Sequence, residues 1–184
     1  MRILILASGS GSLAQAIFEA DLDLEIVQVI SDKDAQVLDR AELAGIPTTY
    51  LPFETDRKSW DSKLFTLVEG FKPDLVVSVG FMRILAANFI ARFPTINTHP
   101  ALLPNFPGAH AVRDALAAGV KTTGATVHWV DEGVDTGKVI ASIEVPVLAG
   151  DDAASLHERI KIVERKLIVQ TLAEFISNGI DGKK

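Results

Sequence analysis

Short apolar runs alternate with helix-like segments through the first half of this chain, and this alternation constrains the fold more than any other feature. The apolar runs are 2–7, 24–31, 48–52, 74–79 and 95–98. Segments with helical spacing or helix start and stop signals separate them, at 12–22, 34–44, 56–70 and 86–91, and Asp34 is the predicted cap of the second. Strand runs with little polar alternation are typical of a parallel sheet covered by helices on both faces. We therefore predict an α/β fold.

The second half of the chain departs from this pattern. A helix is predicted at 109–118, and two extended segments, 122–130 and 137–147, then follow without a helix between them. Such a pair favours an antiparallel hairpin that extends the sheet. A long helix over 152–177 closes the predicted structure, and the length of 184 residues suits a single domain spanning 1–184.

Composition narrows the class of protein. The hydrophobic fraction of 48% and charged fraction of 23% are those of a globular chain. A net charge of −6 argues against broad capture of nucleic acid, and no apolar run is long enough to cross a membrane. Because cysteine is absent, disulfides and thiolate metal sites are excluded. We expect a cytoplasmic monomer or homodimer that binds neither nucleic acid nor membrane.

A glycine turn follows the first apolar run. Residues 9–14, GSGSLA, fit the dinucleotide fingerprint G-x-G-x-x-G/A, and Asp32 stands at the spacing of a ribose-binding acid. The exposed backbone N–H groups of such a turn suit any phosphate. The alternatives are therefore an anion site, a dinucleotide site, or a tight turn that needs only backbone freedom.

A proline-rich loop follows the fifth apolar run, in the stretch INTHPALLPNFPGAH at 96–110. Prolines at 100, 104 and 107 restrict the backbone, so Asn97 and His99 would be held at low entropic cost. Two residues apart at the end of a strand, they point to the same side. An amide and an imidazole together suit the stabilisation of an oxyanion, although His99 could instead only hydrogen-bond the loop.

Asp135 lies in the turn VDEGVDTG at 130–137 and matters only if the hairpin brings it to His99. A carboxylate there would favour the charged imidazole and could relay protons through water. We interpret Asp131 and Glu132 as solvated turn residues, and His128 as a structural strand residue. The histidine spacings fit no metal site, and the G-x-S-x-G elbow of serine hydrolases is absent.

Together these motifs resemble the folate-dependent formyltransferase superfamily. SGSGS, GFMRIL at 80–85, NTHPALLPNFPGAH and VDEGVDTG stand in that family's order and spacing over nearly the whole chain. The resemblance implies a Rossmann-like scaffold and no metal. It also implies transfer of a formyl group from the cosubstrate 10-formyltetrahydrofolate to the amine of glycinamide ribonucleotide, in purine biosynthesis.

The resemblance also implies a role for each matching residue. Asn97, His99 and Asp135 match the catalytic trio, with direct attack of the amine and the oxyanion held by Asn97 and His99. The remaining matches are substrate-binding: the phosphate at Gly9, Ser10, Gly11 and Ser12; the ribonucleotide and its amine at Lys161 and Glu164; and the folate at Met82, Arg83, Ile84, Leu85, Val130 and Asp131. From the helix pattern alone, Lys161 and Glu164 would be solvated charges.

One residue departs from the family pattern, and several rival functions remain. Leu13 stands where many relatives have asparagine, which removes one phosphate contact. Formyltetrahydrofolate hydrolase and methionyl-tRNA formyltransferase share the catalytic domain but carry a further domain, for which we expect no room in 184 residues. A nucleotide-binding module and a nicotinamide dehydrogenase are the alternatives from other classes.

Overall fold

Strands and helices alternate through residues 1–180, the part of the chain that the computed structural model describes. The strands are β1 (Arg2–Ala7), β2 (Glu25–Ser31), β3 (Thr48–Tyr50), β4 (Leu75–Ser78), β5 (Thr95–His99), β6 (Thr122–Trp129) and β7 (Val139–Pro146). The helices are α1 (Ser12–Phe18), α2 (Gln36–Leu43), α3 (Arg57–Phe71), α4 (Ala87–Arg92), α5 (Ala111–Ala117) and α6 (Ala153–Asn178). The predicted elements are confirmed, although several end at different residues.

The strands of the described residues form a seven-stranded sheet in the order β3-β2-β1-β4-β5-β6-β7. β1 pairs in parallel with β2 and with β4, and β2 pairs in parallel with β3. β6 and β7 pair antiparallel. The predicted α/β class, mostly parallel with a hairpin at its C-terminal end, is therefore confirmed.

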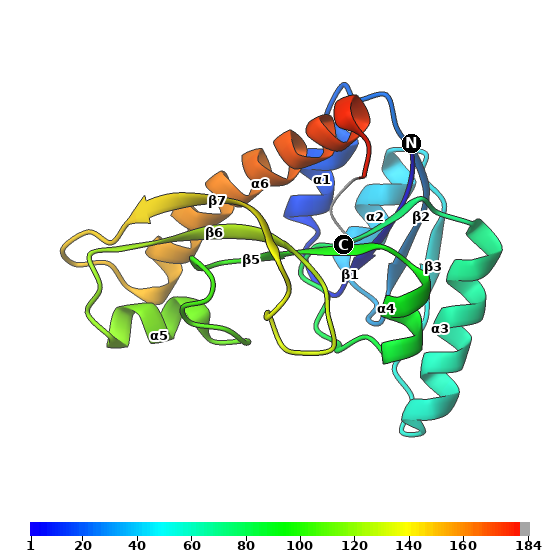
Figure 1. Cartoon of the computed structure of the whole chain (residues 1–184), viewed down its shortest axis with the longest axis horizontal. Coiled ribbons are helices and arrows are strands. Elements are labelled where there is room, and N and C mark those ends of the chain that lie inside the picture. Colours follow the sequence, from blue (N-terminus) through cyan, green and yellow to red (C-terminus); the bar gives the residue numbers. More distant parts are fainter. Residues whose placement is uncertain (181–184) are drawn as a thin grey trace. The chain divides into compact units, whose positions relative to one another are not determined.

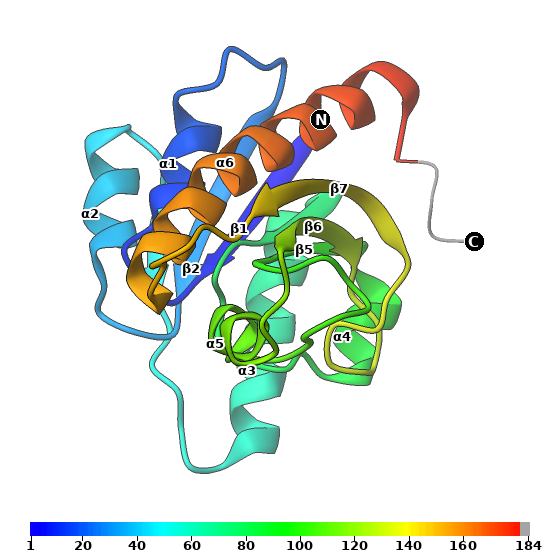
Figure 2. The same cartoon turned by 90° about the vertical axis from the view of Figure 1, so that its left-hand side faces the viewer.

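The chain divides into two compact units, of which the first is Met1–Ile96. Its central strands are apolar on both faces because helices cover both: in Figure 2, α1 and α2 lie on one side of β1 and β2, and α3 lies on the other. Residues Ile3 to Leu6 are fully buried in consequence. The strand order reverses between β1 and β4, and ligands of open α/β sheets bind at the carboxyl ends of the strands beside such a reversal.

Helix ends in this unit follow local chemistry, with one exception to the prediction. Asp56 caps α3 by accepting hydrogen bonds from the backbone N–H groups of Lys58 and Ser59. Asp34, in contrast, does not cap α2. The N-cap is Ala35, which makes no side-chain cap bond, so the prediction at Asp34 was wrong by one residue.

The second unit begins at Asn97 and is built around the β6–β7 hairpin. α6 packs along both strands of this hairpin, as Figure 1 shows. A capping box starts the helix: the Asp152 carboxylate accepts from the backbone N–H of Ser155, and the Ser155 hydroxyl accepts from the backbone N–H of Asp152. None of the helices within 1–180 combines the length and the apolar character that a membrane span needs.

Candidate active site

His99 ends β5 and is held by the loop that follows the strand. Its side chain is 4% exposed, and its Nε2–H donates to the carbonyl of Phe106 at 2.8 Å. The same loop is fixed to β6, because the backbone N–H of Leu103 donates to the Thr126 hydroxyl, which in turn donates to the carbonyl of Ala101. The predicted stiff loop is thus tied down at both its start and its middle.

Asp135 reaches His99 from the turn between β6 and β7. Its Oδ2 lies 3.2 Å from Nδ1 of His99 and accepts the backbone N–H of Gly108 at 2.8 Å. Asp135 takes a left-handed backbone conformation with φ of 56°, which is uncommon for a residue other than glycine. The hairpin therefore brings Asp135 to His99, which is the condition on which its predicted role depended.

The proton positions of His99 follow from its two neighbours. Both ring nitrogens face oxygen acceptors, the Phe106 carbonyl and the Asp135 carboxylate. A neutral imidazole carries one N–H, so it can satisfy only one of these acceptors. The geometry therefore suits the doubly protonated, positively charged ring.

Asp135 is set up to stay ionised beside this ring. Burial raises the pKa of its carboxyl, but hydrogen bonds from His128 and Gly108 and the nearby charge of His99 lower it by more. The net pKa lies below the ordinary value of 3.8. A carboxylate is thus present at neutral pH.

His128 is a fourth member of the cluster that the sequence analysis missed. Its side chain is 2% exposed, its Nδ1–H donates to the carbonyl of Trp129 at 2.9 Å, and its Nε2 lies 3.5 Å from Oδ1 of Asp135. The amide nitrogen of Asn97 lies 3.3 Å from the same Nε2. The one available signal was position: His128 is the penultimate residue of the strand that leads into the Asp135 turn.

The ring of His128 lies between Asn97 and Asp135. Its Nε2 is 3.3 Å from the Asn97 amide nitrogen and 3.5 Å from Oδ1 of Asp135, so both neighbours face one ring nitrogen. Asn97, His99, His128 and Asp135 thus form one polar cluster in the second unit. An amide, an imidazolium and a carboxylate in one cluster can stabilise an oxyanion and move a proton.

In the first unit, the glycine turn 9–12 opens α1 as predicted. Gly11 is the N-cap with φ of 75°, and an added Cβ would come within 2.7 Å of the Val37 side chain. Glycine is therefore required there for two reasons, the left-handed conformation and the close approach of α2. Gly9 and Ser10 are exposed beside it.

Asp32 does not extend toward a nucleotide ribose. Its side chain is fully buried, Oδ1 accepts from the Ser8 hydroxyl at 2.5 Å, and Oδ2 accepts from Nε of Arg83 at 2.6 Å. Both carboxylate oxygens are engaged inside the protein. A dinucleotide site would need Asp32 to bind the ribose, so this arrangement argues against the dinucleotide alternative.

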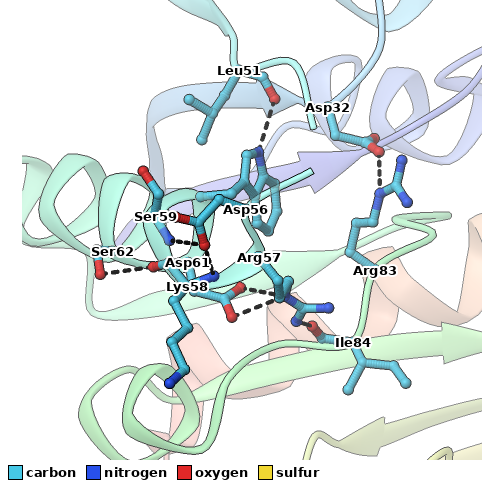
Figure 3. A network of polar contacts seen from close by, with 11 residues as sticks. Asp32, Leu51, Asp56, Arg57, Lys58, Ser59, Asp61, Ser62, Arg83 and Ile84 are labelled. Atoms are coloured by element: carbon cyan, nitrogen blue, oxygen red, sulfur yellow. Dashed lines mark hydrogen bonds and ion pairs between the residues drawn. The ribbon is translucent and has the colours of Figure 1, made fainter. Parts of the chain in front are cut away.

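The segment Met82–Leu85 leaves the end of β4 and alternates in exposure. Met82 and Ile84 are 60% and 58% exposed, whereas Leu85 is 6% exposed. The guanidinium of Arg57 donates to the carbonyl of Ile84, and Arg83 bonds Asp32, as Figure 3 shows. In this predicted folate segment, Met82 and Ile84 are therefore exposed apolar side chains, and polar contacts hold the backbone that carries them.

The other predicted substrate residues lie in the second unit. Asp131 is exposed and accepts from the backbone N–H of Gly133 and the hydroxyl of Thr136, as expected of a turn residue, and Val130 directly precedes it after β6. Lys161 pairs with Glu158 at 2.7 Å on α6.

Glu164 differs from the solvated charge that the helix pattern indicated. It is only 4% exposed, and burial raises its pKa from 4.5 to about 7, against a smaller lowering by the charge of Lys161. Buried carboxylates with raised pKa values are enriched at functional sites. The interpretation from the helix pattern alone was wrong at this residue.

Within residues 1–180, no group of three or more His, Cys, Asp or Glu side chains is arranged to hold a metal ion. The chemistry of the described cluster is that of hydrogen-bond donors and a carboxylate.

Comparison with known proteins connects this chain to a family. The formyl transferase family model matches residues 1–172. Phosphoribosylglycinamide formyltransferase of Mycobacterium tuberculosis H37Rv is 48% identical over 97% of this chain and 86% of that protein. The human trifunctional purine biosynthetic protein adenosine-3 is 41% identical over 97% of this chain and 18% of its own length.

A solved structure agrees with the sequence matches. The crystal structure of glycinamide ribonucleotide transformylase 1 from Symbiobacterium toebii superposes with a TM-score of 0.92 at 38% identity, covering 96% of this chain and 88% of that one. The chain therefore belongs to the formyl transferase family, and it is a one-carbon transferase.

Proposed function

We propose that this chain transfers the formyl group of 10-formyltetrahydrofolate to the primary amine of glycinamide ribonucleotide, as a phosphoribosylglycinamide formyltransferase of purine biosynthesis. The observation that carries the proposal is the 3.2 Å contact between His99 and Asp135 beside Asn97, in a chain 48% identical to a relative of that name. The human relative's name also refers to purine biosynthesis.

The amine attacks the formyl carbon directly, without a covalent enzyme intermediate. A carbon–nitrogen bond forms, the carbonyl electrons move to the oxygen, and a tetrahedral oxyanion results. Asn97 donates a hydrogen bond to this oxygen, and the protonated His99 stabilises it by its positive charge or by an N–H that leaves its present acceptor; the charge on the oxygen is absent in the ground state. Donors that act mainly on the transition state raise turnover more than they improve binding.

Collapse of the intermediate breaks the bond between the formyl carbon and N10 of the folate. The attacking nitrogen loses a proton and N10 gains one, so the transfer is balanced without an external acid or base. Asp135 supports the charge of His99 throughout and accepts and returns protons through water. Its lowered pKa keeps it available as the carboxylate at neutral pH.

Each remaining predicted residue takes a binding role in this proposal. Gly9, Ser10, Gly11 and Ser12 hold the ribonucleotide phosphate, mainly through backbone N–H groups because Leu13 offers no polar side chain. Met82, Arg83, Ile84 and Leu85, with Val130 and Asp131, line the folate. Lys161 and Glu164 bind the ribonucleotide, with Glu164 at the amine.

The family match over residues 1–172 supports treating 1–184 as a single formyltransferase domain. We also propose that the reaction uses no metal, as the family resemblance implies, and the negative net charge of −6 supports small-molecule substrates rather than nucleic acid. We further propose that the protein acts in the cytoplasm as a monomer or homodimer.

An absorbance assay of 10-formyltetrahydrofolate consumption, with and without glycinamide ribonucleotide, tests the proposal. We expect consumption only when the amine is present, with one formylated amine formed per folate consumed. Consumption that ignores the amine would instead identify a hydrolase. No consumption under either condition would leave a binding module and would refute the proposed reaction.

A further inference from the structure

We propose that Asp32 is a positioning residue that holds the segment Gly80–Leu85 in its binding shape, acting through Ser8 and Arg83. This inference rests on the proposed function, because it takes Met82–Leu85 as the folate-binding segment. It adds Asp32 and Ser8, to which neither the sequence pattern nor the family resemblance gave a role in this reaction.

The buried carboxylate joins three segments that follow three different strands. Ser8 follows β1, Asp32 follows β2, and Arg83 lies beyond β4. Oδ1 of Asp32 accepts the Ser8 hydroxyl at 2.5 Å, and Oδ2 accepts Nε of Arg83 at 2.6 Å. The segments meet at the carboxyl end of the parallel strands, where ligands of such sheets bind.

Ser8 extends the connection to the backbone of the folate segment. Its hydroxyl donates to Asp32 and accepts the backbone N–H of Met82 at 2.9 Å, while its own N–H donates to the carbonyl of Gly80 at 3.1 Å. Because the hydroxyl has one proton, donating it to Asp32 leaves its lone pairs for Met82. The carboxylate therefore sets the direction of the hydroxyl, and the hydroxyl sets the position of Met82.

Arg83 is held on two sides. Its Nε pairs with Asp32, and its guanidinium carbon lies 3.9 Å from the centroid of the Phe53 ring. The Arg83 side chain is 28% exposed, whereas the Asp32 side chain is fully buried. Removing the carboxylate would leave the cation half-buried without its partner, so Arg83 would move toward water and carry the segment with it.

The matched variant is Asp32→Asn, which keeps the size of the side chain but has one acceptor oxygen for two donors. We expect the KM for 10-formyltetrahydrofolate to rise by about 10-fold or more, the range of a lost hydrogen bond to a charged group, while kcat stays within about 3-fold. Simple loss of folded protein would lower kcat and leave KM unchanged. Asp39→Asn, at an exposed acid on α2, is the control that should change neither.

Ser8→Ala is the milder second variant, since it preserves the ion pair between Asp32 and Arg83. In both Ser8→Ala and Asp32→Asn, the amide hydrogen of Met82 should exchange with solvent faster than in the wild type. NMR measures this exchange, and the spectra also show whether each variant keeps the wild-type fold. The double variant Asp32→Asn/Arg83→Gln, which forms a neutral amide pair, should lose less than the sum of its single variants.

Unchanged folate KM in Asp32→Asn, with unchanged exchange at Met82, would overturn the inference. Additive losses in the double variant would also contradict it. Failure of the proposed function can be distinguished from failure of this inference, because the wild-type protein itself would then show no formyl transfer.

Discussion

Nδ1 of His99 lies 3.2 Å from Oδ2 of Asp135, although the two residues are 36 positions apart in the chain. His99 ends a strand, and Asp135 sits in a hairpin turn with a left-handed backbone. The hydrogen bond from Gly108 to Asp135 and that from His99 to Phe106 close the arrangement. An imidazole ring held between two oxygen acceptors is the feature from which the proposed reaction follows.

Replacing His99 by alanine should lower kcat by about 10²- to 10³-fold, the usual effect of removing one oxyanion donor. The fold should persist, because the core strands and helices do not depend on this ring. Steady-state kinetics together with a thermal melt would check both statements. Wild-type kcat in a folded His99→Ala protein would remove the ring from the mechanism.

Replacing Asp135 by asparagine should lower kcat at neutral pH. The pKa of Asp135 lies below 3.8 in the folded protein, so the wild type carries this negative charge in the neutral range. The amide of the variant supplies no such charge to the His99 ring 3.2 Å away and cannot accept a proton from water. Steady-state kinetics should show a loss of about 10²- to 10⁴-fold, the range for a group that transfers protons. Wild-type kcat in a folded Asp135→Asn protein would remove the carboxylate from the mechanism.

Replacing His128 by phenylalanine should lower kcat by up to about 10-fold, the range of one lost neutral hydrogen bond, with little change in KM. The phenyl ring keeps a buried ring but offers no nitrogen to the Asn97 amide or to the Asp135 carboxylate. A double-mutant cycle with Asn97→Ala tests whether His128 acts by positioning Asn97. We expect the two losses not to add, and additive losses would assign the effect to the contact with Asp135 instead.

Replacing Glu164 by glutamine should stabilise the protein at alkaline pH. The folded pKa of about 7 lies above the ordinary value of 4.5, so the folded state holds its proton over this window and the unfolded state does not. Stability therefore falls as pH rises through the window, and the full cost is present above the folded pKa. Glu164→Gln should gain about 1–3 kcal/mol at about pH 8 and little at about pH 5.

Urea unfolding at the two pH values measures this gain, with Glu174→Gln, at an exposed acid on the same helix, as the control. Equal stability of Glu164→Gln and wild type at both pH values would contradict a buried, destabilising carboxylate. If Glu164 binds the substrate amine, the stabilised variant should also be less active, the common trade-off at binding sites.

The sequence predicted the elements well because their signals are local. Apolar runs such as 2–7 and 74–79 become strands whose apolar residues are buried, and Asp152 caps α6 through a residue three positions away. Asp34 failed as a cap because helix ends depend on the backbone angles of single residues, which a capping residue only favours.

Prediction of the site was less complete, for a physical reason. The side-by-side placement of Asn97 and His99 follows from strand alternation, but the contact with Asp135 depends on the hairpin register and turn, which no local pattern gives. Glu164 was misjudged because burial comes from tertiary packing, and the contact of His128 with Asp135 depends on the same hairpin turn. The spacing of Asp32 likewise suited a ribose-binding acid, but its tertiary contacts with Ser8 and Arg83 occupy the carboxylate instead.

Following an isotope-labelled formyl carbon by NMR tests the central claim most directly. The protein is given labelled 10-formyltetrahydrofolate and glycinamide ribonucleotide, and the fate of the label is observed. We predict that the label moves to the ribonucleotide amine as a formamide, rapidly with the wild type and about 10²- to 10³-fold more slowly with His99→Ala. Label released as free formate, or formamide formed equally fast by both proteins, would contradict the account.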